Sequence, residues 1–69
     1  MIARAAVYTK SGRKYFVLVP SARSEADAAD QAFRLVTEQG QIVTRTAAYK
    51  QDQSNPVVEN YIDEDGQWH

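Results

Sequence analysis

Cysteine is absent from this chain of 69 residues, and its one histidine is residue 69. Without cysteine, the chain forms no disulfide and offers no thiolate to a metal ion. A histidine at the end of a chain is poorly placed for catalysis, because a general base must be held within hydrogen-bonding distance of its target. We therefore expect a protein that is not an enzyme and that has no metal and no cofactor.

Long apolar runs are also lacking. A membrane-spanning helix needs roughly 20 consecutive apolar residues, and no segment of the chain approaches that length. The first residues do not form a signal peptide, because Arg4 interrupts what would have to be an apolar run. We expect a cytoplasmic protein that does not associate with membranes.

Glycine is scarce, and its three positions exclude another class of site. Gly12, Gly40 and Gly66 are widely separated, so the chain contains no glycine-rich phosphate loop. The segment Asp63 to Gly66 superficially resembles the start of a calcium-binding loop. Tyr61 stands where an upstream ligand would be needed, and the closing glutamate is missing. We interpret this segment as a solvated acidic turn.

Charge is nearly balanced overall but strongly segregated along the chain. The formal net charge is −1. Residues 1–20 carry four basic side chains and no acidic one, whereas residues 51–69 carry five acidic side chains and no lysine or arginine. The two regions either neutralise each other, within one molecule or across a dimer, or present separate charged surfaces to a partner.

Two β-patterned segments begin the chain. Residues 2–9 alternate, residues 15–19 are β-branched and aromatic, and the polar loop between them contains Gly12, which suits a hairpin. A two-residue or four-residue loop places Tyr8 opposite Tyr15. That register puts Ala5, Val7, Phe16 and Leu18 on one face, and Arg4, Ala6, Tyr8, Tyr15, Val17 and Val19 on the other. A three-residue loop would shift the pairing by one residue and mix these two sets.

A single amphipathic helix is predicted over residues 24–39. Ser24 is a good N-cap, the acidic residues Glu25 and Asp27 suit the positive end of the helix dipole, and Gly40 is suited to end the helix. Its apolar side is rich in alanine, which lets a helix approach a sheet closely, and Phe33 is its largest anchor.

Strand patterns follow the helix at residues 41–49 and 57–62, separated by a polar loop over residues 50–56. Asp65 and Gly66 mark a turn, after which residues 67–69 form a short returning strand. The order predicts one domain, residues 1–69, of the α+β class, with one helix packed on a mostly antiparallel sheet of three to five strands. The predicted core residues are Ala5, Val7, Ala26, Ala29, Phe33, Val36 and Val43, together with Phe16 and Leu18. Because so small a chain buries only about 60% of the surface that its unfolded form exposes, a homodimer is one way to complete the core.

Basic and aromatic residues occur together in the first hairpin. Stacking aromatics beside cations is how open sheets hold single-stranded nucleic acid, yet tyrosine and arginine are equally favoured in protein interfaces. The tyrosines can also simply cover the sheet, so three interpretations of this patch stay open. Trp68 similarly either closes an edge of the core, which we favour, or lies exposed in an interface.

The whole outline resembles small proteins encoded by phages and mobile elements, in particular anti-CRISPR inhibitors. The likeness lies in the ββα order, in Glu25, Ala26 and Ala29 after the second strand, and in the ending, with Tyr61, Glu64 to Gly66 and Trp68. It implies a non-enzymatic inhibitor, in the host cytoplasm, that binds a CRISPR effector complex and occludes a functional surface. Basic residues, or acidic ones that mimic phosphates, would make the contact. The predicted partner-binding residues are Arg4, Tyr8, Lys10, Arg13, Lys14, Tyr15, Arg45, Asp63, Glu64 and Asp65.

A second resemblance is to antitoxins of the HicB kind. In these, a ββα unit also runs through residues like Tyr15, Val17, Val19 and Pro20 into a helix rich in Glu and Ala. It implies a nucleic-acid-binding antitoxin or small regulator that uses the basic residues Arg4, Lys10, Arg13 and Lys14. The glycine-containing turns typical of that family between strand and helix are missing here, so this is the alternative function.

Overall fold

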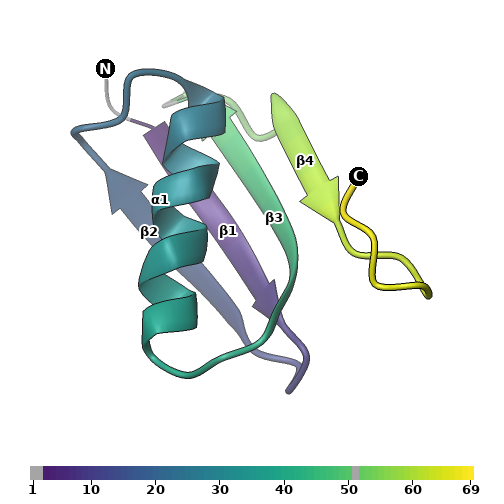
Figure 1. Cartoon of the computed structure of the whole chain (residues 1–69). Helices are drawn as coiled ribbons and strands as arrows, with labels where there is room; N and C mark the ends of the chain where they lie inside the picture. The colour runs from purple at the N-terminus through teal and green to yellow at the C-terminus, as the bar shows by residue number, and fades with distance from the viewer. Residues whose placement is uncertain (1–2, 51) are drawn as a thin grey trace.

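The computed structural model describes residues 3–50 and 52–69. The elements follow in the order β1 (Ala3–Thr9), β2 (Lys14–Val19), α1 (Glu25–Glu38), β3 (Val43–Lys50) and β4 (Val58–Tyr61). The four strands form one antiparallel sheet in the order β2-β1-β3-β4, and α1 crosses one face of it (Figure 1). The predicted α+β class, with one helix on an antiparallel sheet, is confirmed.

Most predicted boundaries lie within two residues of the observed ones. The main difference is at the end of the chain, where the returning segment is only a short bridge. Tyr61 and His69 exchange backbone hydrogen bonds, and Ile62 and Trp68 form an isolated antiparallel bridge between them. Residue 2, expected at the start of the first strand, and residue 51, expected in the polar loop, lie outside the described residues.

The register of the first hairpin differs from the predicted one. The Thr9 N–H donates to the Arg13 carbonyl at 2.9 Å, which leaves a three-residue loop over residues 10–12. Gly12 has a φ of 88°, the left-handed conformation that such loops place in their last position. Tyr8 consequently pairs with Lys14, and the predicted pairing of Tyr8 with Tyr15 is wrong by one residue.

A shift of one residue exchanges the two faces of a strand. Tyr15, Val17 and Val19 therefore face the helix, whereas Phe16 and Leu18 lie on the open face with 68% and 62% of their surface exposed. The prediction that Phe16 and Leu18 belong to the core was wrong for this reason.

Small side chains make up most of the core between α1 and the sheet. Val7 is the largest side chain that is completely buried. The predicted core residues Ala5, Val7, Ala29, Val36 and Val43 are buried and Phe33 is half-buried, but Ala26 is exposed. The helix lies mainly over β1 and β3, and the alanines that face them, Ala28, Ala29 and Ala32, allow its close approach.

The N-terminus of α1 is capped as the sequence predicts. The Ser24 Oγ accepts the Asp27 N–H at 3.1 Å, and the Asp27 carboxylate accepts the Arg23 N–H at 2.9 Å. The Arg23 N–H and the Gln31 side chain lower the pKa of Asp27 below its usual value. The first of these bonds satisfies a donor that the first turn of the helix leaves free, and the second ties the residue before the cap to that turn.

Replacing Ser24 with alanine is expected to lower the free energy of unfolding by about 1 kcal/mol, the usual effect of losing an N-cap hydrogen bond. Urea denaturation followed by circular dichroism measures the change. Ser21→Ala is the matched control, because the Ser21 hydroxyl donates to the Gln31 side chain in a solvent-exposed hydrogen bond and accepts no N–H of the helix. Equal losses in the two variants would contradict this role for Ser24.

Candidate functional site

The sheet face that α1 leaves uncovered brings together three cations and four aromatic rings. Strand pairing aligns these side chains in rows across the sheet. One row runs Lys14, Tyr8, Arg45, Tyr61; a second runs Phe16, Ala6, Ala47, Glu59; and a third runs Leu18, Arg4, Tyr49. We call this surface the open face and define it by these eleven residues.

Cations of the open face lie over its rings. The Lys14 ammonium is 5.1 Å from the centroid of Tyr8 and 4.7 Å from that of Phe16. The guanidinium of Arg45 lies 5.1 Å from Tyr8. Such contacts each stabilise by about 0.5–1 kcal/mol at exposed sites, and they hold the long side chains across the sheet. The two alanines of the middle row are buried beneath this layer.

A hollow of about 290 Å³ opens on this face between Arg4, Lys14, Phe16, Tyr49 and Ser54. Arg4 donates from Nη2 to the Gln53 carbonyl at 2.7 Å and lies 5.7 Å from the Tyr49 ring. Its Nε is buried and has no hydrogen-bond partner among the described residues. In the same part of the chain no carboxylate forms an ion pair with Arg4 or Lys14. The hollow therefore combines two unpaired cations with two aromatic walls.

Arg45 is the cation of the open face that has an acidic partner. Its Nη2 donates to Glu59 Oε1 at 2.7 Å, and this contact raises the pKa of Arg45 above its usual value. About half of each side chain is exposed to solvent, so the pair contributes little to stability. Its effect is to orient Arg45 over Tyr8 rather than to hold the sheet together.

The structure places the predicted partner-binding residues in three regions. Four of them lie together on the open face: Arg4, Tyr8, Lys14 and Arg45. Lys10 and Arg13 are exposed at the adjacent hairpin tip. Tyr15 is separated from them, because the corrected register turns it toward the core cluster beneath the helix. The acidic residues 63–65 lie in the C-terminal turn.

Sequence reasoning missed four residues of this surface: Phe16, Leu18, Tyr49 and Tyr61. Phe16 and Leu18 were missed because the predicted hairpin register was wrong by one residue. The alternative register, with a three-residue loop, places both of them on this face. The sequence shows which neighbours in their own strands share a face with Tyr49 and Tyr61, because side chains alternate along a strand. Only the pairing of β1 with β3 and of β3 with β4 shows that both tyrosines lie on the face of Arg4 and Tyr8.

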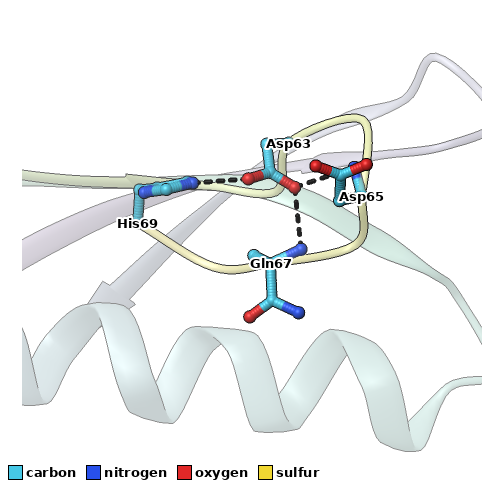
Figure 2. A network of polar contacts seen from close by, with 4 residues as sticks. All are labelled: Asp63, Asp65, Gln67 and His69. Carbon is cyan, nitrogen blue, oxygen red and sulfur yellow. Dashed lines mark hydrogen bonds and ion pairs between the residues drawn. The ribbon is translucent and has the colours of Figure 1, made fainter.

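The C-terminal turn is organised by one carboxylate, as Figure 2 shows. Oδ1 of Asp63 accepts the N–H groups of Asp65 and Gln67, both at 2.9 Å. Oδ2 of Asp63 lies 2.6 Å from Nε2 of His69, whose ring stacks on Tyr61 with a centroid separation of 5.2 Å. The His69 contact and the Gln67 amide lower the pKa of Asp63. Asp63 is thus occupied within the turn, whereas Glu64 and Asp65 have exposed side chains.

The pKa of Asp63 predicts how this turn responds to acid. Since the folded-state value lies below the usual 3.8, Asp63 stabilises the turn above that pH, and the contribution is lost as the pH falls through the lowered pKa. We expect the amide proton of Gln67, followed by NMR, to titrate below pH 3.8. Asp63→Asn should remove the transition and Glu64→Gln should keep it. A midpoint at or above the usual value would contradict this role.

Trp68 partly covers the core at the side where α1 and β4 come together. Its ring meets Phe33 edge-on, with centroids 5.5 Å apart and an interplanar angle of 85°. Together with Ala26, Ala29 and Asn60 these rings line a groove of about 390 Å³ between α1 and β4. Trp68 still has 42% of its surface exposed, so it both covers the core edge and faces solvent.

Comparison with protein-family models, curated proteins and solved structures found no match. Among residues 3–50 and 52–69, no group of three acidic or histidine side chains is placed to hold a metal ion. Over the same residues, the one helix is neither long enough nor apolar enough to cross a membrane.

Proposed function

We propose that this protein is a non-enzymatic binding protein that covers a surface of a protein partner with the open face of its sheet. The single observation that carries this proposal is the hollow between Arg4 and Lys14, with its unpaired cations and aromatic walls. A carboxylate of the partner would pair with the Arg4 guanidinium and the Lys14 ammonium that line the hollow. The exposed rings and Leu18 would contact apolar groups beside that carboxylate.

The composition of the open face fits a protein interface. Tyr, Phe and Arg are enriched where proteins meet, and the residues that dominate binding are aromatic or Arg side chains next to a desolvated pocket. The resemblance to anti-CRISPR inhibitors makes a CRISPR effector complex in the host cytoplasm the first partner to test. Occlusion of its nucleic-acid-binding or recruitment surface is the expected mode of action.

Site-specific photo-crosslinking in host cells tests the proposal. A photoreactive phenylalanine analogue at position 16 reports the open face, and the same analogue at position 35 reports the opposite layer, because Phe16 and Leu35 are both exposed. We expect position 16 to crosslink one host protein in stoichiometric amount, counted apart from any crosslink to a second copy of this chain, and position 35 to crosslink none. The captured protein, purified, should then form a stoichiometric complex with the unmodified chain. No crosslink at position 16, or equal crosslinks at both positions, would contradict the proposal.

A second candidate function is binding of single-stranded nucleic acid. It is favoured by the row in which cations and rings alternate across all four strands, Lys14, Tyr8, Arg45 and Tyr61. Against it, the rings of Tyr8 and Tyr49 already have cations over them, which obstructs stacking of bases.

Salt dependence distinguishes this second candidate. Fluorescence anisotropy with labelled single-stranded RNA and DNA measures affinity at two salt concentrations. For three phosphate contacts, affinity is expected to fall about 20-fold between about 50 and 200 mM salt, from a slope of about −0.7 per contact. Absence of binding at the lower salt concentration would exclude this function and leave the protein interface.

A further inference from the structure

The outer edge of β2 is unpaired in the part of the chain that the structure describes. Figure 1 shows β2 at one side of the sheet and β4 at the other. Exposed edge strands are usually protected by charged residues, proline or a bulge. At β2 such residues stand only at the two ends, Lys14 and, directly after the strand, Pro20. Between them the edge presents Phe16 and Leu18 on the open face, 68% and 62% exposed, and half-buried Tyr15 and Val17 on the helix side.

The hydrogen-bonding alternation of the hairpin determines which backbone groups are free at this edge. Thr9 and Arg13 form a hydrogen-bonded pair, and such pairs recur at every second residue of an antiparallel ladder. Tyr15, Val17 and Val19 therefore bond to β1. The backbone N–H and C=O groups of Phe16 and Leu18 point outward, where an added strand would meet them.

We propose that β2 pairs with β2 of a second copy of this chain, antiparallel and about a two-fold axis at Val17. In this register Phe16 lies opposite Leu18 of the second copy, and the two exchange backbone hydrogen bonds. Tyr15 lies opposite Val19, and Val17 opposite Val17. Every opposed pair from residue 15 to residue 19 is then apolar on both sides, so the strand is complementary to itself.

The charges near the edge are compatible with a second copy. In the proposed register Lys14 falls beyond the apolar stretch, opposite Pro20 of the second copy, so no like charges are opposed. Of the two neighbouring symmetric registers, Phe16 opposite Phe16 would place Lys14 against Leu18 and bury fewer apolar pairs. Leu18 opposite Leu18 would place Phe16 against Pro20, which has no N–H to donate to the added strand. On the helix side, the half-buried Tyr15 and Val17 of both copies would join, which extends a core whose buried side chains are mostly small.

Pairing through β2 produces one continuous sheet of eight strands. Because the two-fold axis is normal to the sheet, both helices lie on one side and both open faces lie on the other. The dimer would therefore present two basic and aromatic surfaces side by side. This inference goes beyond the proposed function and does not depend on which partner the open face binds.

Sedimentation equilibrium over a range of protein concentrations tests the pairing. The unmodified chain is expected to reach twice its mass of 7.8 kDa. Phe16→Glu and Leu18→Lys each place a charge opposite an apolar side chain, and each is expected to weaken dimerisation about 10-fold or more. The double variant sets the new glutamate of each copy opposite the new lysine of the other. This pairing of opposite charges occurs twice, and should return the affinity to within about 3-fold of the unmodified chain.

The control is Ile42→Lys, which adds the same charge at a residue that is also 62% exposed but lies outside β2. It should leave dimerisation unchanged. Because the substituted side chains are already exposed, circular dichroism should show all variants folded. A chain that stays monomeric up to about 1 mM would overturn the proposal, as would a dimer insensitive to Leu18→Lys. Failure of the double variant to recover would exclude the proposed register.

Discussion

Reversing the charges of Lys14 and Arg45 together, as Lys14→Glu with Arg45→Glu, is expected to weaken binding of the partner about 100-fold. Lys14 borders the hollow of the open face, and Arg45 lies beside it over the shared ring of Tyr8. In the proposed complex both cations face an acidic surface, so each reversal replaces attraction with repulsion. Isothermal titration calorimetry with the purified crosslinked partner measures the loss.

A matched variant controls for net charge. The double variant Arg23→Glu with Arg34→Glu changes the net charge by the same amount as the Lys14 and Arg45 reversals. It also breaks one exposed ion pair, between Arg34 and Asp30, as Arg45→Glu breaks the pair with Glu59. Both substitutions lie outside the open face, on the turn before α1 and on α1 itself. The control should bind within about 3-fold of the unmodified chain, which corresponds to less than about 1 kcal/mol. Equal losses in the two variants would show that only overall charge matters and would contradict the proposed site.

Replacing Ala32 with leucine is expected to lower the free energy of unfolding by about 1–3 kcal/mol. Ala32 is completely buried between α1 and the sheet, where it packs with Ala5, Val7 and Val36. A larger side chain there pushes the helix away from β1 and β3 and weakens the packing between the helix and the sheet. Because a chain of this length has a total stability of only about 3–10 kcal/mol, the loss is a large fraction of it and should lower the midpoint of thermal unfolding by several degrees.

The same substitution at Ala26 is the control for helix propensity. Ala26 is on the same helix but is exposed, at the margin of the groove beside Trp68. Ala26→Leu should change stability by less than about 0.5 kcal/mol, the usual range for surface substitutions. Thermal and urea denaturation of both variants measure the difference. Similar stabilities for the two would contradict a core whose spacing depends on buried alanine.

The helix was the element that the sequence predicted best. Its boundaries follow from local chemistry: Ser24 caps its first turn, Gly40 follows its end, and apolar residues recur on one side. Each of these signals acts over a few residues, so no tertiary contact is needed to read them. The strands were also located to within two residues for the same reason, since β-branched and aromatic runs are bounded by polar turns.

The candidate site was harder to predict, because it depends on how strands pair. The sequence brought Arg4, Tyr8 and Lys14 into one patch but put Tyr15 with them and left out Phe16. A single residue in the length of the first hairpin loop decides between these sets, since neighbouring side chains of a strand point to opposite faces. The loop length depends on the conformation of Gly12, which the composition of the loop leaves open.

By itself, the amino-acid order determined the number and kind of elements, the cap of the helix and the separation of basic from acidic regions, because these follow from interactions between near neighbours. Tertiary structure alone decided the strand order β2-β1-β3-β4 and the register of each pair. It thereby brought Arg45, Tyr49 and Tyr61 to Tyr8 and Arg4. The physical reason is that hydrogen bonding between strands is the same for any sequence, so burial under α1 selects which side chains remain on the open face.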